Sequence, residues 1–205
     1  NSDITRGAFR VCRNIFGKPE NTTKYVAEIR EEPITLLTGF DRYRALETTE
    51  GHWACLYKRD LIRMNPYPED LAVGEDSLFL ISAVTACSSI AVTPDVVYEY
   101  RDSEGSAMNN YNLRKFLDEV DWRDRAWEIL APHNRELADF FALNYWSSRM
   151  QESLDIVLAA HERNIFLSKA NELNRKLTSD TAINESILSK ILEAEEHALR
   201  QIKDQ

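Results

Sequence analysis

Residues 74–79 of this chain read Gly74-Glu75-Asp76-Ser77-Leu78-Phe79, and they decide how the neighbouring sequence is interpreted. Two adjacent carboxylates stand here directly before an apolar run that continues to Ile90. Because apolar residues recur in this run at steps of three and four, the run predicts a largely buried helix. Glu75 and Asp76 then lie in the first turn of that helix.

Two roles are open for this pair of acids. In the structural role, they complement the partial positive charge and the free N–H groups at the start of a helix. In the functional role, a carboxylate directed from a helix start into a cleft takes a proton from a substrate hydroxyl group. The local sequence by itself favours the structural role, so the surrounding motifs have to decide between the two.

The overall composition restricts the class of protein. The chain has 205 residues, of which 43% are hydrophobic, and this suits one domain or one domain with an appendage. Its net charge of -9 argues against general nucleic-acid binding, which depends on clustered Lys and Arg side chains. We also expect no membrane span, because no apolar run reaches the length that crosses a bilayer.

The cysteines and the first residues give two further expectations. Cys12, Cys55 and Cys87 are odd in number and widely spaced, which argues against a disulfide framework and against a zinc site. This usage fits a reducing compartment, so we expect a cytoplasmic protein. The chain begins with Asn1 and reaches apolar residues within a few positions, so we expect a fragment that starts inside a fold.

The first 110 residues predict strands mixed with short helices. We expect a strand over 3–12, leaving a loop at Gly7, and then a hairpin-like excursion or a surface loop over 14–32 that contains a short strand over 25–29. Further along, the patterns predict a helical segment over 38–46, a strand or helix start over 53–57, a short helix over 58–62 that ends before Pro66, and strands over 90–92 and 96–101 joined by a turn at Pro94-Asp95.

The remainder of the chain predicts helices alone. From Leu113 onward the sequence contains no glycine and only one proline, Pro132. Helices are expected over about 112–130, 133–161, 164–177 and 181–203. The last of them has an apolar stripe that permits packing within the chain or homo-oligomer formation, and its short length favours the former. The stripe consists of Ile187, Ile191, Ala194, Ala198 and Ile202.

Several segments, taken in order, resemble the second half of a family 2 glycosyltransferase. They are Trp53-Ala54-Cys55-Leu56-Tyr57-Lys58-Arg59-Asp60-Leu61, Pro66-Tyr67-Pro68, the stretch around Glu75 and Asp76, and Tyr98-Glu99-Tyr100-Arg101 with Gly105-Ser106. The openings Ser2-Asp3-Ile4 and Gly7-Ala8-Phe9 resemble the strand that follows the metal-binding acidic motif of that family. The resemblance covers residues 2–110. It departs from the family at Cys55, where a lysine is usual, and in the absence of a Gly-rich donor loop and an Asp-x-Asp triplet.

This resemblance implies a fold, an activity and a division of the chain. The fold class expected is α/β, a partial GT-A-type sheet with flanking helices followed by an all-helical carboxy-terminal region, with helix predominating. Residues 1–110 would be the acceptor-side half of the transferase domain and residues 111–205 a helical appendage. The activity implied is an inverting, bacterial-type transfer of a sugar from a nucleotide-sugar donor to a glycan or other hydroxyl acceptor. A divalent metal, Mn²⁺ or Mg²⁺, is expected for the full-length enzyme, and this fragment alone would be inactive because the donor and metal site is missing.

The resemblance also assigns roles to individual residues. Asp76 is implied as the general base and Glu75 as a residue that orients or assists it. Arg101 would face the donor phosphates, or else be a surface arginine paired with a neighbouring acid. Trp53 would be a platform for the acceptor sugar, or else a tryptophan of the core. Ser106, in the Gly-Ser turn, is assigned with them to substrate binding.

No metal ligand is predicted within the chain. The four histidines are scattered along the sequence, and single histidines are more often structural than ligands. They are His52, His133, His161 and His197.

A second class of function is open. The chain can be a non-catalytic helical module for interaction or oligomerisation, in which the acidic pair is only a helix cap. The helix-rich second half and the missing donor motif favour this alternative. Binding of nucleotide diphosphates separates the two classes, since only the transferase requires it.

Overall fold

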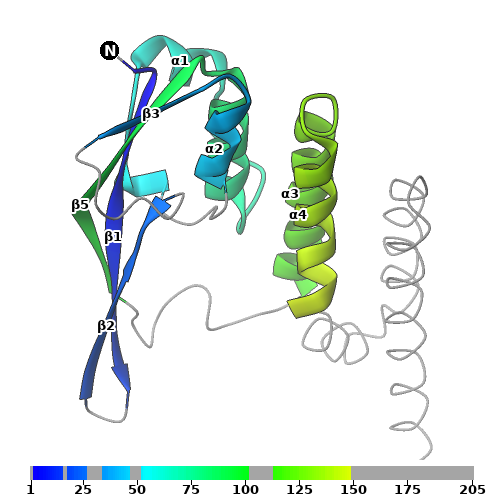
Figure 1. Cartoon of the computed structure of the whole chain (residues 1–205). Helices are drawn as coiled ribbons and strands as arrows, with labels where there is room; N and C mark the ends of the chain where they lie inside the picture. Colours follow the sequence, from blue (N-terminus) through cyan, green and yellow to red (C-terminus); the bar gives the residue numbers. More distant parts are fainter. Residues whose placement is uncertain (1, 16–17, 27–33, 47–51, 102–112, 149–205) are drawn as a thin grey trace, which may run out of the picture. The chain divides into compact units, whose positions relative to one another are not determined.

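The computed structural model of the chain describes residues 2–15, 18–26, 34–46, 52–101 and 113–148 (Figure 1). The chain divides into two compact units, Asn1–Asn110 and Tyr111–Gln205. The first unit holds all of the described strands, and the second holds the last two described helices.

The first unit is built on a five-stranded mixed sheet. Its strands are β1 (Ile4–Ile15), β2 (Lys18–Lys24), β3 (Thr35–Thr38), β4 (Cys55–Tyr57) and β5 (Ser89–Arg101). The order across the sheet is β2-β1-β5-β3, and β4 pairs with the beginning of β1. Only β1 and β5 run parallel, while the other three pairings are antiparallel. The strands twist and curve into a half-barrel (Figure 1).

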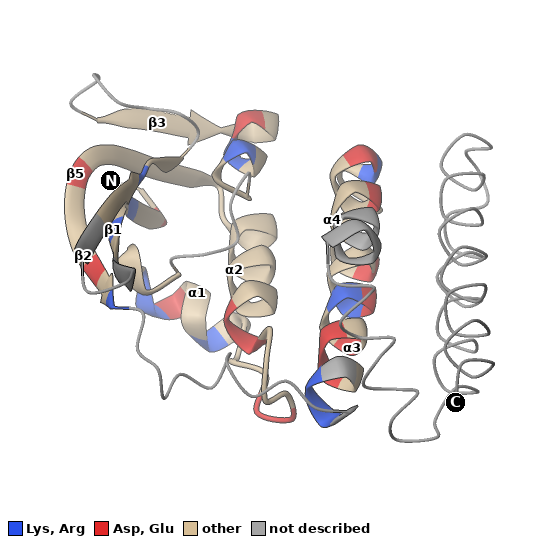
Figure 2. Cartoon of the chain, turned by 90° about the horizontal axis from the view of Figure 1, so that it is seen from below, with Lys and Arg blue, Asp and Glu red and all other residues tan. Residues whose placement is uncertain are grey.

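Helices and 3-10 turns complete this unit. They are η2 (Gly39–Leu46), η3 (His52–Ala54), α1 (Arg59–Met64) and α2 (Glu75–Ala86). Helix α2 lies beside the sheet, and its interior residues from Leu78 to Ile81 are buried. Its only charged residues are the two acids at its start, which Figure 2 shows as the red end of an otherwise uncharged helix. The predicted buried helix with Glu75 and Asp76 in its first turn is therefore confirmed up to Ala86, but the prediction carried it too far, because Ile90 lies in β5.

Both ends of α2 are determined by identifiable contacts. Gly74 precedes the helix with a φ of 80°, in the left-handed region that favours glycine, and its carbonyl accepts the Leu78 N–H at 2.9 Å. At the other end the Arg42 guanidinium donates to the carbonyls of Val84 and Thr85, at 3.1 and 3.3 Å. A cation at the last carbonyls of a helix complements its dipole, so α2 is stabilised at the end opposite its acids.

The two strands predicted over 90–92 and 96–101 are wrong, because β5 is one continuous strand. Its pairing with β1 moves from Arg6↔Val92 directly to Ala8↔Val96, so three residues of β5 lie opposite Gly7 alone. Such a bulge accommodates the proline at position 94, which has no N–H to give to the ladder. The sequence signal for a turn therefore marks an irregularity inside the strand.

Two other predictions of local structure need correction. Gly7 lies within β1 and not in a loop. The strand predicted over 25–29 is not found at Tyr25 and Val26, which follow β2, and positions 27–29 lie outside the described residues. Of the two alternatives for 14–32, the hairpin-like excursion is the one observed, because β2 pairs antiparallel with β1. The short helix expected from 58 is confirmed as α1.

The predicted fold class is wrong as well. The described residues form a mixed half-barrel sheet with several helices, and not the GT-A-type sheet followed by an all-helical region. Apolar patterning locates strands, but it does not determine which strands pair with one another. In addition, β2 joins the sheet although its residues are mostly polar and typical of a loop. The helices predicted over 164–177 and 181–203, with the stripe that begins at Ile187, lie outside the described residues.

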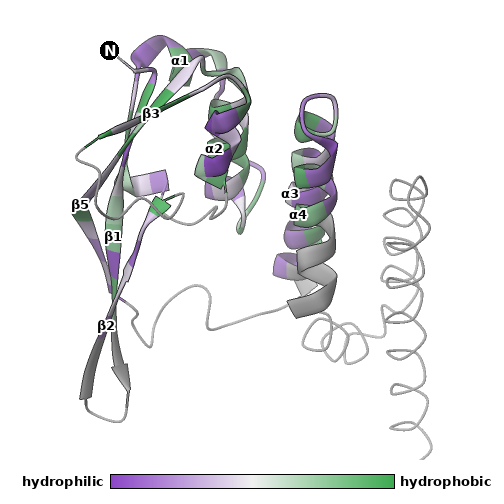
Figure 3. Ribbon diagram, viewed as in Figure 1, coloured by the Kyte–Doolittle hydropathy of each residue, from purple (hydrophilic) through white to green (hydrophobic). Residues whose placement is uncertain are grey.

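The second unit is described as a pair of helices, α3 (Leu113–Leu130) and α4 (Arg135–Ser148). Over the parts of these helices that Figure 3 colours, hydrophilic and hydrophobic residues are interspersed. A tight turn joins them, in which Leu130 O accepts N–H groups from His133 and Asn134 at 2.8 and 2.7 Å. Asn134 then begins α4, because its Oδ1 accepts the Leu137 N–H at 3.1 Å.

Candidate functional site

The Asp76 carboxylate is held at the start of α2. Its Oδ1 accepts the backbone N–H of Ser77 at 2.7 Å and lies 3.4 Å from the Ser77 hydroxyl. About a third of the side chain, 34%, remains accessible to solvent. Asp76 thus satisfies a free N–H of the first turn and still has an oxygen available to other groups, so the structural and functional roles are compatible.

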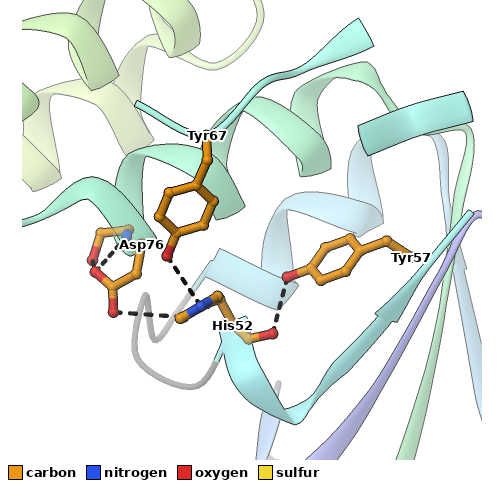
Figure 4. Close-up of polar contacts among 5 residues, drawn as sticks. His52, Tyr57, Tyr67 and Asp76 are labelled. Carbon is orange, nitrogen blue, oxygen red and sulfur yellow. Dashed lines mark hydrogen bonds and ion pairs between the residues drawn. The ribbon is translucent and has the colours of Figure 1, made fainter. Parts of the chain in front are cut away.

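His52, from η3, lies between Asp76 and Tyr67 (Figure 4). Its Nδ1 is 3.5 Å from Asp76 Oδ2, and its Nε2 is 3.1 Å from the Tyr67 hydroxyl. The backbone carbonyl of His52 accepts the Tyr57 hydroxyl at 3.1 Å. Because 3.5 Å is longer than a normal N–H···O bond, the Asp76 contact is mainly electrostatic in this geometry, and Nδ1 is a buried atom with no closer partner among the described residues.

Aromatic rings fix the positions of these polar groups. The buried Phe79 ring of α2 packs against Tyr57 and Tyr67, with centroid separations of 5.2 and 4.9 Å, and edge-on to His52 at 6.5 Å. Tyr67 also packs on the His52 ring at 5.8 Å. Since such contacts hold a ring in one orientation, the hydroxyl and imidazole groups are directed by packing and not only by hydrogen bonds.

The environment favours the ionised form of Asp76. Burial is the largest influence and raises the pKa of this carboxyl, but the His52 ring and the two hydrogen bonds from Ser77 outweigh it, so the pKa lies below its ordinary value. Burial, together with the charges of Asp76 and Glu75, raises the pKa of Tyr67 to about 12. Burial also raises the pKa of Tyr57. At neutral pH the site therefore holds the ionised Asp76 carboxylate together with two protonated phenols.

Trp53 lies next to His52 but contacts a different set of residues. Its ring packs against Phe9 at 4.8 Å, Tyr98 at 4.1 Å and Tyr100 at 5.6 Å. These four aromatic rings form a cluster on one face of the sheet, where Phe9 of β1 is paired with Tyr98 of β5. The contacts favour the core alternative for Trp53, and its use as a sugar platform stays a prediction.

The other predicted site residues are not brought together with Asp76 by any contact within the described part of the chain. Arg101 is exposed at the end of β5, directly after Tyr100, and alternation along the strand places it on the sheet face opposite the aromatic cluster. Glu75 is half-buried beside Asp76 on α2. Ser106 lies outside the described residues.

A buried cation lies close to the site, on β1. Arg6 is fully buried and its guanidinium donates to the backbone carbonyl of Ala45. Burial lowers the pKa of this guanidinium and raises the pKa of the Cys55 thiol, which occupies the paired position on β4. Cys55, the position where the family has a lysine, is therefore a half-buried residue of the sheet that lies opposite Arg6.

The described residues do not fit a divalent-metal site. No group of three or more His, Cys, Asp or Glu side chains among them is placed to hold a metal ion. The Mn²⁺ or Mg²⁺ expected for the full-length enzyme stays a prediction for that enzyme. In the same part of the chain, none of the helices combines the length and the hydrophobicity that a membrane span requires.

Comparisons with other proteins give no family. No protein-family model matches the chain, and no characterised protein matches it at a significant level. The functional interpretation therefore depends on the residues and their geometry.

His52 and Tyr67 belong to the site, but the sequence does not predict them. His52 is one of four histidines scattered along the chain, although it directly precedes the aromatic segment at Trp53. Tyr67 stands between two prolines, and an extended connection of that kind holds a side chain in a fixed direction. Only the tertiary structure brings these two residues, 15 positions apart, within 3.1 Å of one another.

Proposed function

We propose that residues 1–110 supply the acceptor side and the general base of an inverting glycosyl transfer from a nucleotide-sugar to a hydroxyl acceptor. The observation that carries this proposal is the placement of Asp76. It is an ionised, half-buried carboxylate at the start of an apolar helix, with one oxygen held by Ser77 and the other facing His52. The order of motifs around it resembles the second half of a family 2 glycosyltransferase.

In the proposed reaction, the acceptor hydroxyl oxygen forms a bond to the anomeric carbon of the donor sugar. The bond from that carbon to the diphosphate oxygen breaks, and its electron pair leaves with the nucleoside diphosphate. Asp76 takes the hydroxyl proton as the new bond forms. A carboxylate in this position contributes roughly 10²–10⁴-fold to the rate, because a neutral alcohol is a poor nucleophile.

The surrounding residues suit this task. Tyr57 and Tyr67 keep their protons at neutral pH, so neither competes with Asp76 as a base. The Asp76 carboxylate is itself partly buried, and burial strengthens its interaction with a bound hydroxyl group. Glu75 adds a second negative charge next to Asp76 and would assist in orienting the acceptor.

The test uses the natural gene product that carries this sequence. It is incubated with a panel of nucleotide-sugars in Mn²⁺ or Mg²⁺ buffer, and release of nucleoside diphosphate is measured. We expect release with at least one donor, and a loss of roughly 10²–10⁴-fold in kcat for Asp76→Asn. Asp60→Asn is the matched control, because Asp60 is 86% exposed on α1. Full activity of Asp76→Asn would refute the base assignment, and no release from any donor would refute the transferase.

A further inference from the structure

The orientation of the His52 ring, next to Asp76, is also determined by its contacts. His52 contacts Asp76 through Nδ1 and Tyr67 through Nε2, so one imidazole ring joins two elements that are separate in the sequence (Figure 4). A neutral imidazole has one N–H donor and one acceptor nitrogen, and its neighbours determine which nitrogen carries the hydrogen.

The neighbours favour one tautomer. Tyr67 keeps its proton, so its hydroxyl can donate to Nε2 at 3.1 Å. Nδ1 then carries the hydrogen and points it at the Asp76 carboxylate. In the opposite tautomer, the lone pair of a buried Nδ1 would face an ionised carboxylate at 3.5 Å, two acceptors directed at each other.

We infer that His52 is the positioning residue for Asp76, with Tyr67 fixing the tautomer that directs the Nδ1–H at the carboxylate. The functional meaning of this pair rests on the proposed function, in which Asp76 is the base. His52 does not itself touch the substrate in this scheme. Its Nδ1–H attracts Oδ2 electrostatically at 3.5 Å while the Ser77 N–H bonds to Oδ1, and together the two contacts orient the carboxylate so that its remaining lone pairs are directed toward an acceptor hydroxyl.

The cluster contains few other groups that could account for the same effect. Asp76 faces His52 from η3, Tyr67 from the segment before α2, and Glu75 and Ser77 from its own helix turn. Glu75 repels a second negative charge, so it opposes ionisation of Asp76. Ser77 supplies the only other hydrogen bonds to the carboxylate within the described residues. Among the residues that the structure describes, His52 is therefore the neighbour on another element that can stabilise and orient the ionised form.

The experiment reads the ring and the carboxyl group directly, in the chain as it is. Long-range ¹H–¹⁵N spectra of the imidazole rings report the tautomer of His52. We expect hydrogen on Nδ1 in the wild type and a shift of the population toward hydrogen on Nε2 in Tyr67→Phe, which keeps the ring packing on Phe79. A wild-type ring with hydrogen on Nε2 overturns the inference.

A ¹³C titration of the Asp76 carboxyl gives the second readout. In His52→Phe, only the Ser77 hydrogen bonds still oppose the effect of burial, so the pKa of Asp76 should rise. His52→Gln restores an N–H donor, so the pKa of Asp76 should return part of the way to its wild-type value. His133→Phe, at an exposed histidine of the second unit, is the matched control and should leave Asp76 unchanged. An Asp76 titration that is the same in wild type and His52→Phe overturns the inference, even where Tyr67→Phe behaves as expected.

Neither readout requires turnover. If no donor is transferred, the proposed function fails, but the tautomer and the Asp76 titration can still be measured. If those two measurements fail instead, Asp76 can still be the base, but His52 is not its positioning residue. In an active enzyme, the pair also predicts a pH profile: the acidic limb of kcat/KM moves to higher pH in His52→Phe and partly returns in His52→Gln.

Discussion

Val97 lies directly over Gly7 where the parallel strands β1 and β5 lose their register. A Cβ on Gly7 would lie 2.5 Å from Val97 Cγ2 and 2.7 Å from Val97 Cγ1, with the Asp95 carbonyl oxygen at 3.1 Å. The bulge in β5 brings its backbone this close to β1, and the hydroxyl of Thr93 stabilises it by donating to Asp95 at 2.8 Å. The irregular pairing that joins the two central strands therefore depends on a glycine at position 7.

Gly7→Ala should destabilise the first unit by about 1–3 kcal/mol, the usual cost of forcing a methyl group into a packed site. Val97 is β-branched and stiff, so it cannot turn both of its methyl groups away. Urea unfolding followed through the amide NMR signals of residues 2–101 measures the change. In the double variant Gly7→Ala with Val97→Ala, much of the loss should be recovered, because the two close Cγ atoms are gone.

Gly39→Ala separates this clash from the general effect of adding a methyl group to a glycine. Gly39 has a φ of +52°, and apart from Gly39 itself and its two chain neighbours, no atom of the described residues lies within 4 Å of the position of its Cβ. Its replacement should cost about 1 kcal/mol from backbone strain, with no recovery by Val97→Ala. Equal recovery at Gly7 and Gly39, or none at either, would contradict the steric explanation.

Asp3→Asn should cost about 1–2 kcal/mol, because Asp3 joins three elements through charge-assisted hydrogen bonds. Its Oδ2 accepts the N–H groups of Ser88 and Ser89 at 2.7 and 3.3 Å, and its Oδ1 accepts Lys58 Nζ at 2.8 Å. These contacts connect the start of β1 with the starts of β5 and α1. Asp60→Asn, on an 86% exposed side chain, is the control and should change the free energy of unfolding by less than about 0.5 kcal/mol.

The effect of Asp3→Asn on the free energy of unfolding should also depend on pH. The hydrogen bonds from Lys58 and from the Ser88 and Ser89 N–H groups hold the pKa of Asp3 below its ordinary value of 3.8. The unfolded chain thus binds the proton more readily, so the contribution of Asp3 is complete above 3.8 and is lost as pH falls through the lower folded pKa. The stability difference between wild type and Asp3→Asn should be constant near neutrality and disappear in acid. A difference that persists below the folded pKa would contradict this assignment.

Native-state alkylation should spare the two thiols of the interior. Burial raises the pKa of Cys87 to about 11 and also raises the pKa of Cys55. At pH 8 only about one Cys87 side chain in a thousand is then a thiolate, so iodoacetamide should react with it on the order of 100-fold more slowly than in urea. Mass spectrometry of timed samples measures both rates at each cysteine. Rapid alkylation of Cys87 in the folded chain would show that the end of α2 opens readily.

Local chemistry explains which parts of the fold could be predicted. The apolar periodicity and the acidic first turn of α2, and the position of α1 before Pro66, are set by neighbouring residues, and both helices were predicted correctly. The continuity of β5 through Pro94 depends on pairing with β1, which is distant in the sequence. No pattern within 90–101 records that pairing, so the prediction of two strands was wrong. The β1–β2 hairpin is local, and it matches the hairpin-like excursion that was one of the two alternatives for 14–32.

The residues of the candidate site also fall into those that the sequence predicts and those that it does not. Glu75 and Asp76 could be identified because a carboxylate pair before an apolar helix is visible in one short stretch. His52 and Tyr67 could not, since their relation to Asp76 arises only when η3, the proline-flanked segment and α2 meet around Phe79. Trp53 was identified as an aromatic residue of interest, but its partners Phe9, Tyr98 and Tyr100 come from two other strands.

In the second unit, Asp139→Ala should destabilise the α3–α4 pair by about 1–3 kcal/mol. Asp139 is buried, and its carboxylate accepts Trp127 Nε1 at 2.9 Å and Arg135 Nε at 2.9 and 3.0 Å. The Arg135 guanidinium also lies over the Trp127 ring, 4.8 Å from its centroid. Removing the carboxylate leaves an indole N–H without its acceptor and a cation without its counter-charge, while the partial exposure of Arg135 limits the loss.

Asp121→Ala provides the comparison that assigns this loss to burial. Asp121 and Arg125 form an ion pair of 2.7 Å at the same spacing of four residues, but both side chains are more than a third exposed. Its removal should cost less than about 0.5 kcal/mol, because exposed helical ion pairs contribute little. Urea unfolding followed by near-ultraviolet circular dichroism, which is sensitive to the Trp127 environment, measures both variants. Equal losses would mean that the indole hydrogen bond and the burial of Asp139 add nothing to an ordinary surface ion pair.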